Sequence, residues 1–385
     1  MSSQRTILIN HLLEPPNRVT GITRYLFALL PELLKRNSFK YELLTTWDTE
    51  HLPAAITNSP ARIQTHRYHR SMPRNILAQT AILPRLVRNT GAALEFNCNP
   101  VGCFWPAWPR IITIHDLYFD VLPEKYRRRH RLWWRLFFPA TLASASHAVC
   151  VSENTRNDLR RFYPHLGSKA TVIHEASTLS RQQKTADQLN LQSPYALYVG
   201  NISPNKAPEV LVRSLEILES ENRYLNVYHI GGDDAGLLAQ ATLQSRLRRP
   251  VQSIGRLSDA ELAAAYVNAT CLIVSSSHEG FCLPVLEAQT FGKPVICSDI
   301  PVLREVAGDG ALFFRFGDAV GLANGLKTIF DNANIRQRIA LAAQKNADRF
   351  SWTNAAAELD ILFAKFSNWA GSDRSSSWNP ATSCE

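Results

Sequence analysis

Two glutamates, Glu279 and Glu287, flank a segment that is suited to binding an anion. Pro284 lies between them. Proline is typical of the first turn of a helix, because the N–H group that it lacks would have no hydrogen-bond partner at that position. The residues around the start of this helix would present unpaired backbone amides, and they are Gly280, Phe281, Cys282 and Leu283. Such amides and the helix dipole together favour a negatively charged ligand such as a diphosphate. The alternative is that both glutamates only compensate the helix dipole.

Lys206 is a candidate for the matching positive charge. It lies shortly after the first strand predicted in the second half of the chain, residues 195–199. Ligands of parallel α/β sheets bind beyond the carboxyl ends of the strands, so an ammonium group at this position is suited to neutralising a departing diphosphate. A surface ion pair is the alternative.

Three more candidates follow predicted strands in the first half of the chain. His115 and Asp116 come directly after the strand 110–114. A histidine at a strand end has a structural alternative, and Asp116 could equally cap the following turn. Gly21 lies in the first strand-to-helix connection, where a residue without Cβ lets a phosphate or an acceptor approach the backbone. An ordinary turn glycine is the alternative there.

A scaffold that gathers strand ends is predicted by the hydrophobic pattern. Short apolar runs alternate with longer helical patterns, which is typical of parallel sheets covered by helices on both faces. A helix is predicted over 21–36, and strands are predicted over 6–10, 41–45, 110–114, 148–151, 195–199, 225–230, 251–254, 271–275 and 294–298. A polar segment at 176–193 fits a linker. We therefore expect two doubly wound, Rossmann-like α/β domains, 1–185 and 186–366, facing across a cleft, and a disordered tail, 367–385.

The composition excludes several classes of protein. The chain has 385 residues, of which 45% are hydrophobic and 19% are charged, so it is globular and long enough for two domains. Its apolar runs are far shorter than the roughly 20 residues of a membrane-spanning helix. Its first residues do not resemble a signal peptide, so we expect a cytoplasmic protein. The seven cysteines lack Cys-x-x-Cys spacing, which favours reduced thiols over disulfides or a zinc site.

Basic residues are concentrated in the first half of the chain. Residues 1–185 hold 25 basic and 12 acidic residues, whereas residues 186–385 hold 17 basic and 21 acidic residues. A basic half favours an anionic partner, which could be a nucleic acid, a membrane surface or a phosphorylated small molecule.

The densest basic segment is 125–138, and its pattern predicts a helix with a cationic face. Four arginines cluster on one side, and they are Arg127, Arg128, Arg131 and Arg135. Tyr126, Trp133, Leu136 and Phe137 cluster on the opposite side, which we expect to face the core, with Trp134 and Phe138 beside the basic face. Further arginines of the first half enlarge the positive patch, and they are Arg62, Arg67, Arg70, Arg74, Arg85 and Arg88. The pattern suits peripheral contact with the inner face of an anionic membrane, and a solvated basic face is the alternative.

The segment 279–296, EGFCLPVLEAQTFGKPVI, resembles the signature of family 4 of the retaining, nucleotide-sugar-dependent glycosyltransferases, also called glycosyl transferases group 1. Its two glutamates, seven residues apart, match the paired-glutamate motif of that family. Six more segments are similar to the family's motifs and follow in its order, and they are 21–25, 113–117, 151–159, 199–206, 255–262 and 303–309. The resemblance implies the GT-B fold, in which two such domains face each other.

The resemblance also implies a role for each candidate residue. Lys206 would bind the phosphate of the donor, Glu279 would contact the transferred sugar, and Glu287 would hold the ribose. His115 would lie near the donor sugar, and Gly21 would lie in a loop that borders the cleft.

The implied reaction moves a hexosyl group, with mannosyl preferred, from a GDP-sugar or a UDP-sugar to a hydroxyl of a glycan or lipid-linked acceptor. The anomeric configuration would be retained, in polysaccharide or lipopolysaccharide biosynthesis. No Asp-x-Asp triplet occurs in the sequence, so we expect no metal and no cofactor besides the donor substrate. No carboxylate nucleophile can be identified, and the family favours a front-face route in which the leaving phosphate helps to deprotonate the acceptor.

The sequence departs from the family pattern in its phosphate-binding charges. Family members often carry an arginine near the lysine, but the corresponding residues here are Asn201 and Asn205. Arg256 is the candidate to replace that arginine, and Cys282 stands where a second glycine is usual. This departure leaves open a sugar-nucleotide-binding module with weak catalysis.

The basic first half of the chain leaves open another alternative to the enzyme, a basic nucleic-acid-binding protein. No helix-turn-helix, zinc-finger or RNA-recognition motif occurs in the sequence.

Overall fold

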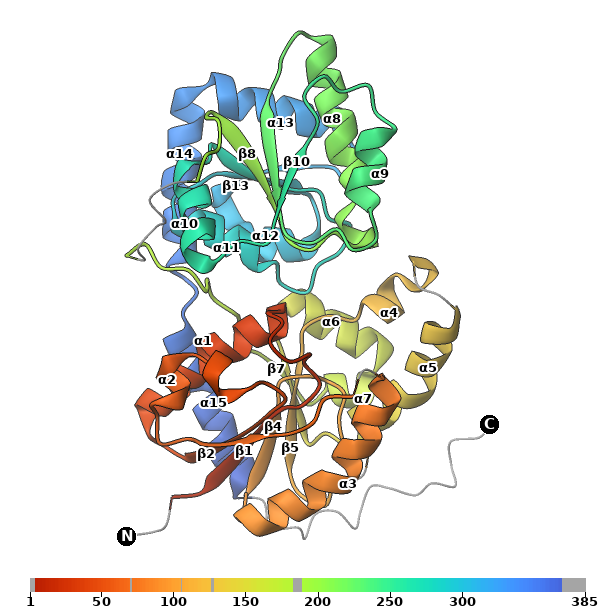
Figure 1. Ribbon diagram of the computed structural model, residues 1–385, viewed down its shortest axis with the longest axis vertical. Coiled ribbons are helices and arrows are strands. Elements are labelled where there is room, and N and C mark those ends of the chain that lie inside the picture. Colours follow the sequence, from red (N-terminus) through yellow and green to blue (C-terminus); the bar gives the residue numbers. More distant parts are fainter. Residues whose placement is uncertain (1–3, 70, 105, 126–127, 183–188, 369–385) are drawn as a thin grey trace.

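The computed structural model describes the chain in five stretches, which are residues 4–69, 71–104, 106–125, 128–182 and 189–368. Within them the chain forms two α/β domains, stacked along the long axis of the molecule (Figure 1). Each domain is built on one parallel sheet with helices on both faces. The predicted fold class is therefore confirmed.

The first domain contains a seven-stranded sheet with the order β3-β2-β1-β4-β5-β6-β7. Its strands are β1 (Thr6–His11), β2 (Lys40–Thr45), β3 (Arg62–Thr65), β4 (Leu94–Asn97), β5 (Arg110–Ile114), β6 (His147–Cys150) and β7 (Ala170–Val172). Side chains alternate between the two faces of a strand. Ile7 and Ile9 therefore pack toward the helix α1 (Gly21–Arg36), whereas Leu8 packs on the opposite side, near α3 (Met72–Thr90).

The second domain contains a six-stranded sheet with the order β10-β9-β8-β11-β12-β13. Its strands are β8 (Tyr195–Val199), β9 (Asn226–Ile230), β10 (Gln252–Gly255), β11 (Cys271–Val274), β12 (Val295–Ser298) and β13 (Ala311–Phe314). Leu272 and Val274 pack on one face, with α10 (Asp259–Asn268), α11 (Leu283–Thr290) and α12 (Pro301–Ala307). Cys271 and Ile273 pack on the other face, with α8 (Pro208–Ser220) and α13 (Ala319–Asp331). Neighbouring strands are parallel, so their carboxyl ends lie at one edge.

Helices connect the strands and cover the sheets (Figure 1). The first domain has α1 (Gly21–Arg36), α2 (Ala54–Thr57), α3 (Met72–Thr90), α4 (Tyr118–Val121), α5 (Arg128–Ala143), α6 (Glu153–Phe162) and α7 (Pro164–Gly167). The second has α8 (Pro208–Ser220), α9 (Leu237–Leu243), α10 (Asp259–Asn268), α11 (Leu283–Thr290), α12 (Pro301–Ala307), α13 (Ala319–Asp331) and α14 (Ala333–Ala347). Among the described residues, no helix combines the length and apolar character needed to cross a bilayer.

The predicted strands and the helix 21–36 agree with the structure to within one residue at each end. Four further strands, β3, β4, β7 and β13, were not predicted. Three of them are short edge strands, which are buried less completely and therefore show a weaker hydrophobic pattern. The fourth, β4, lies in the middle of the sheet, but its buried Glu95 and Asn97 break the apolar run.

The predicted core face of the helix over 125–138 was wrong. Trp134 and Phe138 are buried in α5, and their rings stack with centroids 3.8 Å apart. Leu136 and Phe137, which we expected in the core, are 63% and 40% exposed. The two stacked rings are four residues apart and so lie on one face of the helix. The other side chains that the sequence assigned to the two faces of this helix lie outside the described part of the chain, and they are those of Tyr126, Arg127, Arg128, Arg131 and Trp133.

A final helix, α15 (Trp352–Ser367), returns from the second domain to the first and lies beside α1 (Figure 1). Its buried side chains include Leu359 and Phe363, and the Phe363 ring packs edge-on against Phe39 and Phe96. Residues 352–367 therefore belong to the core of the first domain rather than to the expected domain 186–366. The expected disordered tail begins at residue 367, and its residues 369–385 lie outside the described residues.

We predict that Phe363→Ala lowers the free energy of unfolding of the first domain by about 3–5 kcal/mol, because it leaves a cavity in a fully buried site. Ile361→Ala on the same helix is the matched control, because Ile361 is 68% exposed and its loss should change that free energy by less than about 0.5 kcal/mol. Denaturant unfolding followed by circular dichroism measures both. Equal effects would show that α15 is not part of this core.

Candidate functional site

Glu279 lies in the loop between β11 and α11, and only 5% of its surface is exposed. Its Oε1 accepts hydrogen bonds from the Lys206 ammonium at 2.6 Å and from the Ser276 hydroxyl at 2.5 Å. Its Oε2 accepts one from the Tyr118 hydroxyl of the first domain at 3.1 Å. Two predicted site residues, Glu279 and Lys206, are thus in direct contact. The strand order explains why, since β8 and β11 are neighbours and the loops that follow them meet.

Lys206 ends the short 3-10 turn η3 (Pro204–Lys206), and 17% of its side chain is exposed. Burial alone would lower the pKa of Lys206, but the charge and hydrogen bond of Glu279 outweigh burial, so the pKa is raised above its ordinary value. The ammonium group therefore stays charged over the whole physiological range. The surface ion pair that was the alternative for Lys206 does not describe this buried contact.

The segment after Glu279 has the geometry of the predicted anion site. The helix α11 begins at Leu283, and Pro284 lies in its first turn. Within the described part of the chain, the backbone amides of Phe281, Cys282 and Leu283 donate no hydrogen bond. Cys282 has a φ of 81°, in the left-handed region that favours glycine, which explains why a glycine is usual there. Unpaired amides at a helix N-terminus attract anions.

Gly280 packs against the first domain. A Cβ at this position would lie 1.7 Å from the carbonyl oxygen of His115, so no other residue fits without a shift of the backbone. The carbonyl oxygen of Gly280 accepts hydrogen bonds from the hydroxyls of Ser152 at 2.6 Å and Thr155 at 3.1 Å. Gly280 therefore fastens the Glu279 loop to the other domain.

Glu287 lies further into α11 and is 3% exposed. It accepts hydrogen bonds from the hydroxyls of Thr178, in the linker, and Tyr266, each at 3.1 Å. Burial raises the pKa of Glu287, although the positive charge of Arg24 opposes that effect. Arg24 belongs to α1 of the first domain and also donates to Thr178 at 3.1 Å. The predicted ribose-binding carboxylate is thus held between the second domain and the linker.

His115 is held by two acceptors and is not free to act as a base. Its Nδ1 lies 3.0 Å from a carboxylate oxygen of Glu175, and its Nε2 lies 3.0 Å from the carbonyl oxygen of Cys98. The Cys98 carbonyl can only accept, and an ionised Glu175 can only accept, so this pair of partners favours the imidazolium form, in which both ring nitrogens donate. Burial lowers the pKa of His115, but Glu175 and the Cys98 carbonyl outweigh burial and raise it overall. The surroundings of His115, whose side chain is 16% exposed, therefore favour its positively charged form.

The other two candidates of the first domain have simpler surroundings. Asp116 accepts a hydrogen bond from the backbone amide of Tyr118 at 3.2 Å, so it caps the following turn, as one of its two expected roles required. Gly21 is the first residue of α1, and a Cβ there would meet no atom within 4 Å. Neither residue contacts Glu279 or Lys206 directly.

The two asparagines at the expected arginine positions have different surroundings. Asn205 is buried and donates to the Tyr118 hydroxyl at 3.1 Å and to the His278 carbonyl at 3.0 Å. Asn201 lies at the tip of β8, next to Gly232. A Cβ on Gly232 would lie 3.0 Å from the Asn201 side-chain oxygen and 3.1 Å from the Arg256 guanidinium. The exposed Arg256 guanidinium and the Asn201 side chain thus both approach Gly232, and a carboxylate oxygen of Asp234 lies 3.4 Å from the same Cβ position.

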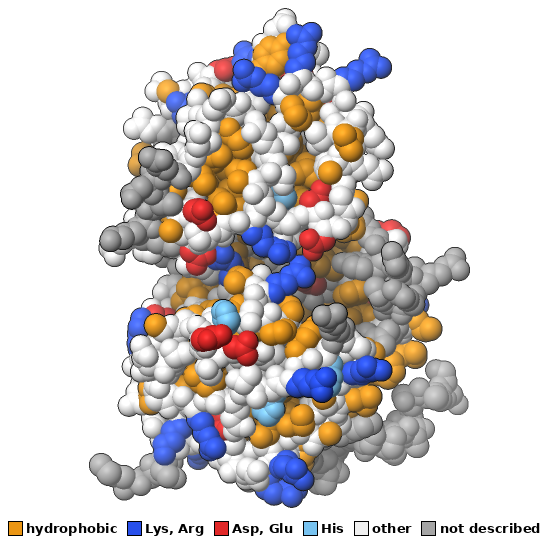
Figure 2. Space-filling model, in the orientation of Figure 1, with side chains coloured by type: hydrophobic (Ala, Val, Ile, Leu, Met, Phe, Trp, Pro, Cys, Tyr) orange, Lys and Arg blue, Asp and Glu red, His pale blue; other side chains and the backbone are white. Residues whose placement is uncertain are grey.

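The two domains meet through charged groups, and Figure 2 shows acidic and basic side chains facing each other where the lobes join. Two ion pairs connect the domains on one side, Arg18 with Asp234 at 3.1 Å and Arg24 with Asp259 at 2.7 Å. On the other side, Glu305 of α12 accepts hydrogen bonds from the first two backbone amides of α6. The Glu279 loop lies between these groups of contacts.

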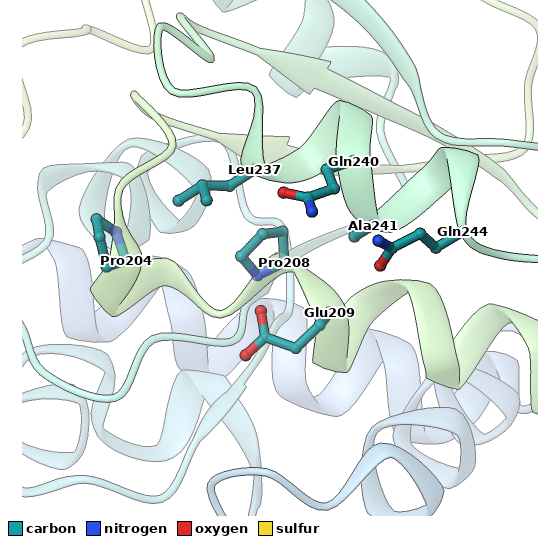
Figure 3. Close-up of a pocket in the computed structure, with 7 residues that line it drawn as sticks. All are labelled: Pro204, Pro208, Glu209, Leu237, Gln240, Ala241 and Gln244. Atoms are coloured by element: carbon teal, nitrogen blue, oxygen red, sulfur yellow. The ribbon is translucent and has the colours of Figure 1, made fainter.

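The pocket in Figure 3 is a separate feature of the second domain, with a volume of about 340 Å³. It lies between α9 and the start of α8, and its lining residues are Pro204, Pro208, Glu209, Leu237, Gln240, Ala241 and Gln244. The hydrogen bonds of Glu279 come from Lys206, Ser276 and Tyr118, so the candidate site is defined by the contacts between loops rather than by this pocket. Among the described residues, no three His, Cys, Asp or Glu side chains form a cluster that could hold a metal ion.

Several residues of the site were not predicted from the sequence. Tyr118, Asn205 and Ser276 hold the Glu279 loop, and Thr178 and Tyr266 hold Glu287. Tyr118, Asn205 and Ser276 lie next to predicted strand ends or within segments that resemble the family's motifs. These positions are the only feature of the sequence that could have indicated a role for them in the site. Nothing in the sequence pattern relates Thr178 or Tyr266 to Glu287.

Comparisons with known protein families match nearly the whole described chain. A model of the glycosyl transferases group 1 matches residues 180–346, and a model of Glycosyltransferase Family 4 matches residues 19–181. Among curated proteins, the O-antigen chain mannosyltransferase B of Escherichia coli is 26% identical over 264 residues, which are 64% of this chain and 68% of that protein. The O-antigen chain mannosyltransferase RfbU of Salmonella typhimurium is 27% identical over 218 residues, which are 57% of this chain and 60% of that protein.

Solved structures share the fold at low sequence identity. The Anabaena protein HepE, solved in complex with UDP-glucose, has a TM-score of 0.73 and 16% sequence identity. The likeness covers 94% of this chain and 100% of the HepE chain. WaaG, a glycosyltransferase involved in lipopolysaccharide biosynthesis, has a TM-score of 0.71 and 13% identity, covering 93% of this chain and 99% of its own. These likenesses concern the fold alone, and they confirm the two facing domains of the GT-B type.

We predict that the His115–Glu175 contact stabilises the protein more at low pH than at high pH. Because the folded pKa of His115 is raised, its contribution is complete below the unfolded pKa of about 6.5 and is lost as the pH rises through the folded pKa. The difference in melting temperature between the natural protein and Glu175→Gln should therefore be larger at about pH 6 than at about pH 9. His51→Gln, which changes a half-exposed histidine, is the control. A difference that does not depend on pH would contradict the imidazolium assignment.

Proposed function

Since the chain belongs to the family 4 glycosyltransferases of group 1, a hexosyltransferase family that uses nucleotide sugars, we propose that it moves a hexosyl group from a nucleoside diphosphate sugar to a hydroxyl of a glycan or lipid-linked acceptor. The observation that carries the proposal is the buried contact of Lys206 with Glu279, next to three unpaired amides at the start of α11. This arrangement offers a cation and peptide donors for a diphosphate and a carboxylate for sugar hydroxyls.

Departure of the nucleoside diphosphate is the demanding step of such a transfer. The Lys206 ammonium and the amides of residues 281–283 would stabilise the negative charge that grows on the leaving oxygen. His115, held by Glu175 and the Cys98 carbonyl, would add a positive charge in its imidazolium form. Glu279 would orient the sugar, and Glu287 would bind the ribose. We further propose retention of the anomeric configuration by a front-face route and no metal requirement.

Arg256 is our candidate for the phosphate charge that Asn201 and Asn205 do not supply. Its guanidinium approaches Gly232, as Asn201 does, and the ion pair that Asp234 forms near this point is with Arg18 rather than with Arg256. A guanidinium can bind two phosphate oxygens at once, which suits this role. Asn205 is committed to the Tyr118 hydroxyl and to His278 and is therefore not available for the donor.

The donor and the biological setting are proposed from the relatives. Two relatives are O-antigen chain mannosyltransferases, which favours mannosyl transfer in polysaccharide or lipopolysaccharide biosynthesis. A GDP-sugar is the donor that we propose first. HepE is known in complex with UDP-glucose, which supports a UDP-sugar as the second choice. The alternative of a module with weak catalysis rests on Asn201 and Asn205, and the alternative of nucleic-acid binding rests on the basic first domain alone.

The first experiment measures transfer and nucleotide binding together. A thermal-shift panel with GDP, UDP, ADP and dTDP should show one nucleotide that raises the melting temperature, because a ligand of the native state stabilises it. The matching sugar nucleotide should be consumed in excess chelator, and nuclear magnetic resonance should show a retained anomeric configuration. Abolition by chelator would contradict metal independence, and an inverted product would contradict retention.

We predict that Lys206→Ala lowers kcat/KM for the donor by about 10²- to 10³-fold, because it removes a charge that stabilises the leaving group. Glu279→Ala should abolish turnover. Lys327→Ala is the matched control, because Lys327 also pairs with a glutamate of the second domain, Glu221, but lies far along the sequence from the site. If the Glu279→Ala variant still bound the nucleotide and kept its turnover, that result would favour the alternative of a sugar-nucleotide-binding module with weak catalysis.

We also propose that α5 brings the first domain to an anionic membrane surface, near a lipid-linked acceptor. Leu132, Leu136 and Phe137 are exposed on α5 together with Arg135. Five of the six other arginines predicted for the positive patch are described and exposed, and they are Arg62, Arg67, Arg74, Arg85 and Arg88. Exposed apolar side chains bordered by basic ones suit the headgroup region of such a membrane.

The protein should therefore sediment with vesicles of phosphatidylcholine that contain about 30% phosphatidylglycerol, and not with pure phosphatidylcholine. The double variant Leu132→Glu, Leu136→Glu should lose most of this binding. Leu243→Glu is the control, because Leu243 is equally apolar and 86% exposed but belongs to the second domain. Identical recovery from both kinds of vesicle would remove the membrane proposal.

A further inference from the structure

Tyr118 connects the first domain to the carboxylate of Glu279. It is the first residue of α4, just beyond the carboxyl end of β5, and its hydroxyl lies 3.1 Å from Oε2 of Glu279. The same hydroxyl accepts a hydrogen bond from Asn205 at 3.1 Å and lies 3.3 Å from the His278 carbonyl. That carbonyl already receives a hydrogen bond from Asn205. The single phenol proton is therefore best used by the carboxylate, which is the stronger acceptor.

The hydrogen bonds of Glu279 leave little room for a ligand. An ionised carboxylate has about four acceptor directions, two on each oxygen. Lys206 and Ser276 use both directions on Oε1, and Tyr118 uses one on Oε2. One of the two acceptor directions on Oε2 therefore remains free within the described structure. The position of the Tyr118 hydroxyl determines which of these two directions is occupied and which is free.

The surroundings of Tyr118 fix its hydroxyl in place. Its backbone amide donates to Asp116, and its ring packs edge-on against His278 at 5.4 Å. Asp120, also in α4, accepts hydrogen bonds from Trp134 of α5 and from Tyr163. Burial raises the pKa of Tyr118, and the charge of Glu279 raises it further, so the phenol keeps its proton.

We propose that Tyr118 is a positioning residue that orients Glu279, so that a single acceptor direction on Oε2 faces a hydroxyl of the bound sugar. Because Tyr118 belongs to the first domain and Glu279 to the second, this orientation exists only while the domains are in contact. Asn205 is part of the same device, since its amide directs the phenol proton toward the carboxylate. The inference rests on the proposed function, in which Glu279 contacts the transferred sugar.

The test uses the full-length protein with the sugar nucleotide that supports transfer. Tyr118→Phe removes only the hydroxyl, so kcat should fall about 10- to 100-fold, as expected for a lost hydrogen bond to a charged group. The KM for the donor should change less than about threefold, because the nucleotide contacts are untouched. Tyr163→Phe is the matched control, since it removes another partly buried phenol, one that supports α4 by donating to Asp120, without touching Glu279. It should change kcat less than about twofold.

A double-variant cycle separates positioning from loss of packing. Ser276→Ala removes a different donor from Glu279, so its effect should couple to that of Tyr118→Phe. The combined loss in kcat should be at least about threefold smaller than the product of the single losses, whereas Tyr163→Phe and Ser276→Ala should multiply. If Tyr118→Phe proves too unstable to assay, Asn205→Ala, which leaves the phenol in place without its donor, should show the same coupling to Ser276→Ala.

Two results would overturn the inference. One is a Tyr118→Phe variant whose kcat matches that of Tyr163→Phe, and the other is simple multiplication with Ser276→Ala. Failure of the proposed function itself is distinguishable, because the natural protein would then transfer sugar from none of the nucleotide donors.

Discussion

The contact between Lys206 and Glu279 is the constraint on which the rest of the site depends. An ion pair removed from water is stable only when further hydrogen bonds offset the loss of hydration. Ser276 and Tyr118 supply these hydrogen bonds to the carboxylate. The parallel order of the second sheet makes the contact possible, because β8 and β11 are neighbours and end at the same edge. A carboxylate and a cation far apart in the sequence therefore meet.

The same loop is also where the two domains are fastened together. Gly280 has no Cβ and lies against the His115 carbonyl, while Ser152 and Thr155 bind its own carbonyl. Tyr118 adds a hydrogen bond to Glu279 in the adjacent position. The geometry of the carboxylate is therefore set by both domains, and any motion that separates them must also change the surroundings of Glu279.

The sequence predicted the parts of this arrangement that depend on chain order, and not those that depend on packing between domains. Strand ends place Lys206 near Glu279, and Pro284 marks the start of α11, so both were predictable. The protonation of His115 was not, because it is decided by Glu175, which lies 60 residues away along the chain. The buried face of α5 was also missed, since both of its faces carry aromatic residues and only the stacking of Trp134 on Phe138 distinguishes them.

The charges of the site limit how a diphosphate can be attracted. Lys206 is paired with Glu279, and His115 is paired with Glu175. At a distance the negative charge of each glutamate largely cancels the positive charge of its partner, so each pair attracts a distant anion only weakly. The amides before α11 and the guanidinium of Arg256 carry no such partner within the described chain. In the proposed function they would therefore attract the nucleotide first. Lys206 would contribute at short range, once a phosphate oxygen competes with Glu279 for its protons, and this competition would link the leaving group to the carboxylate proposed to orient the sugar.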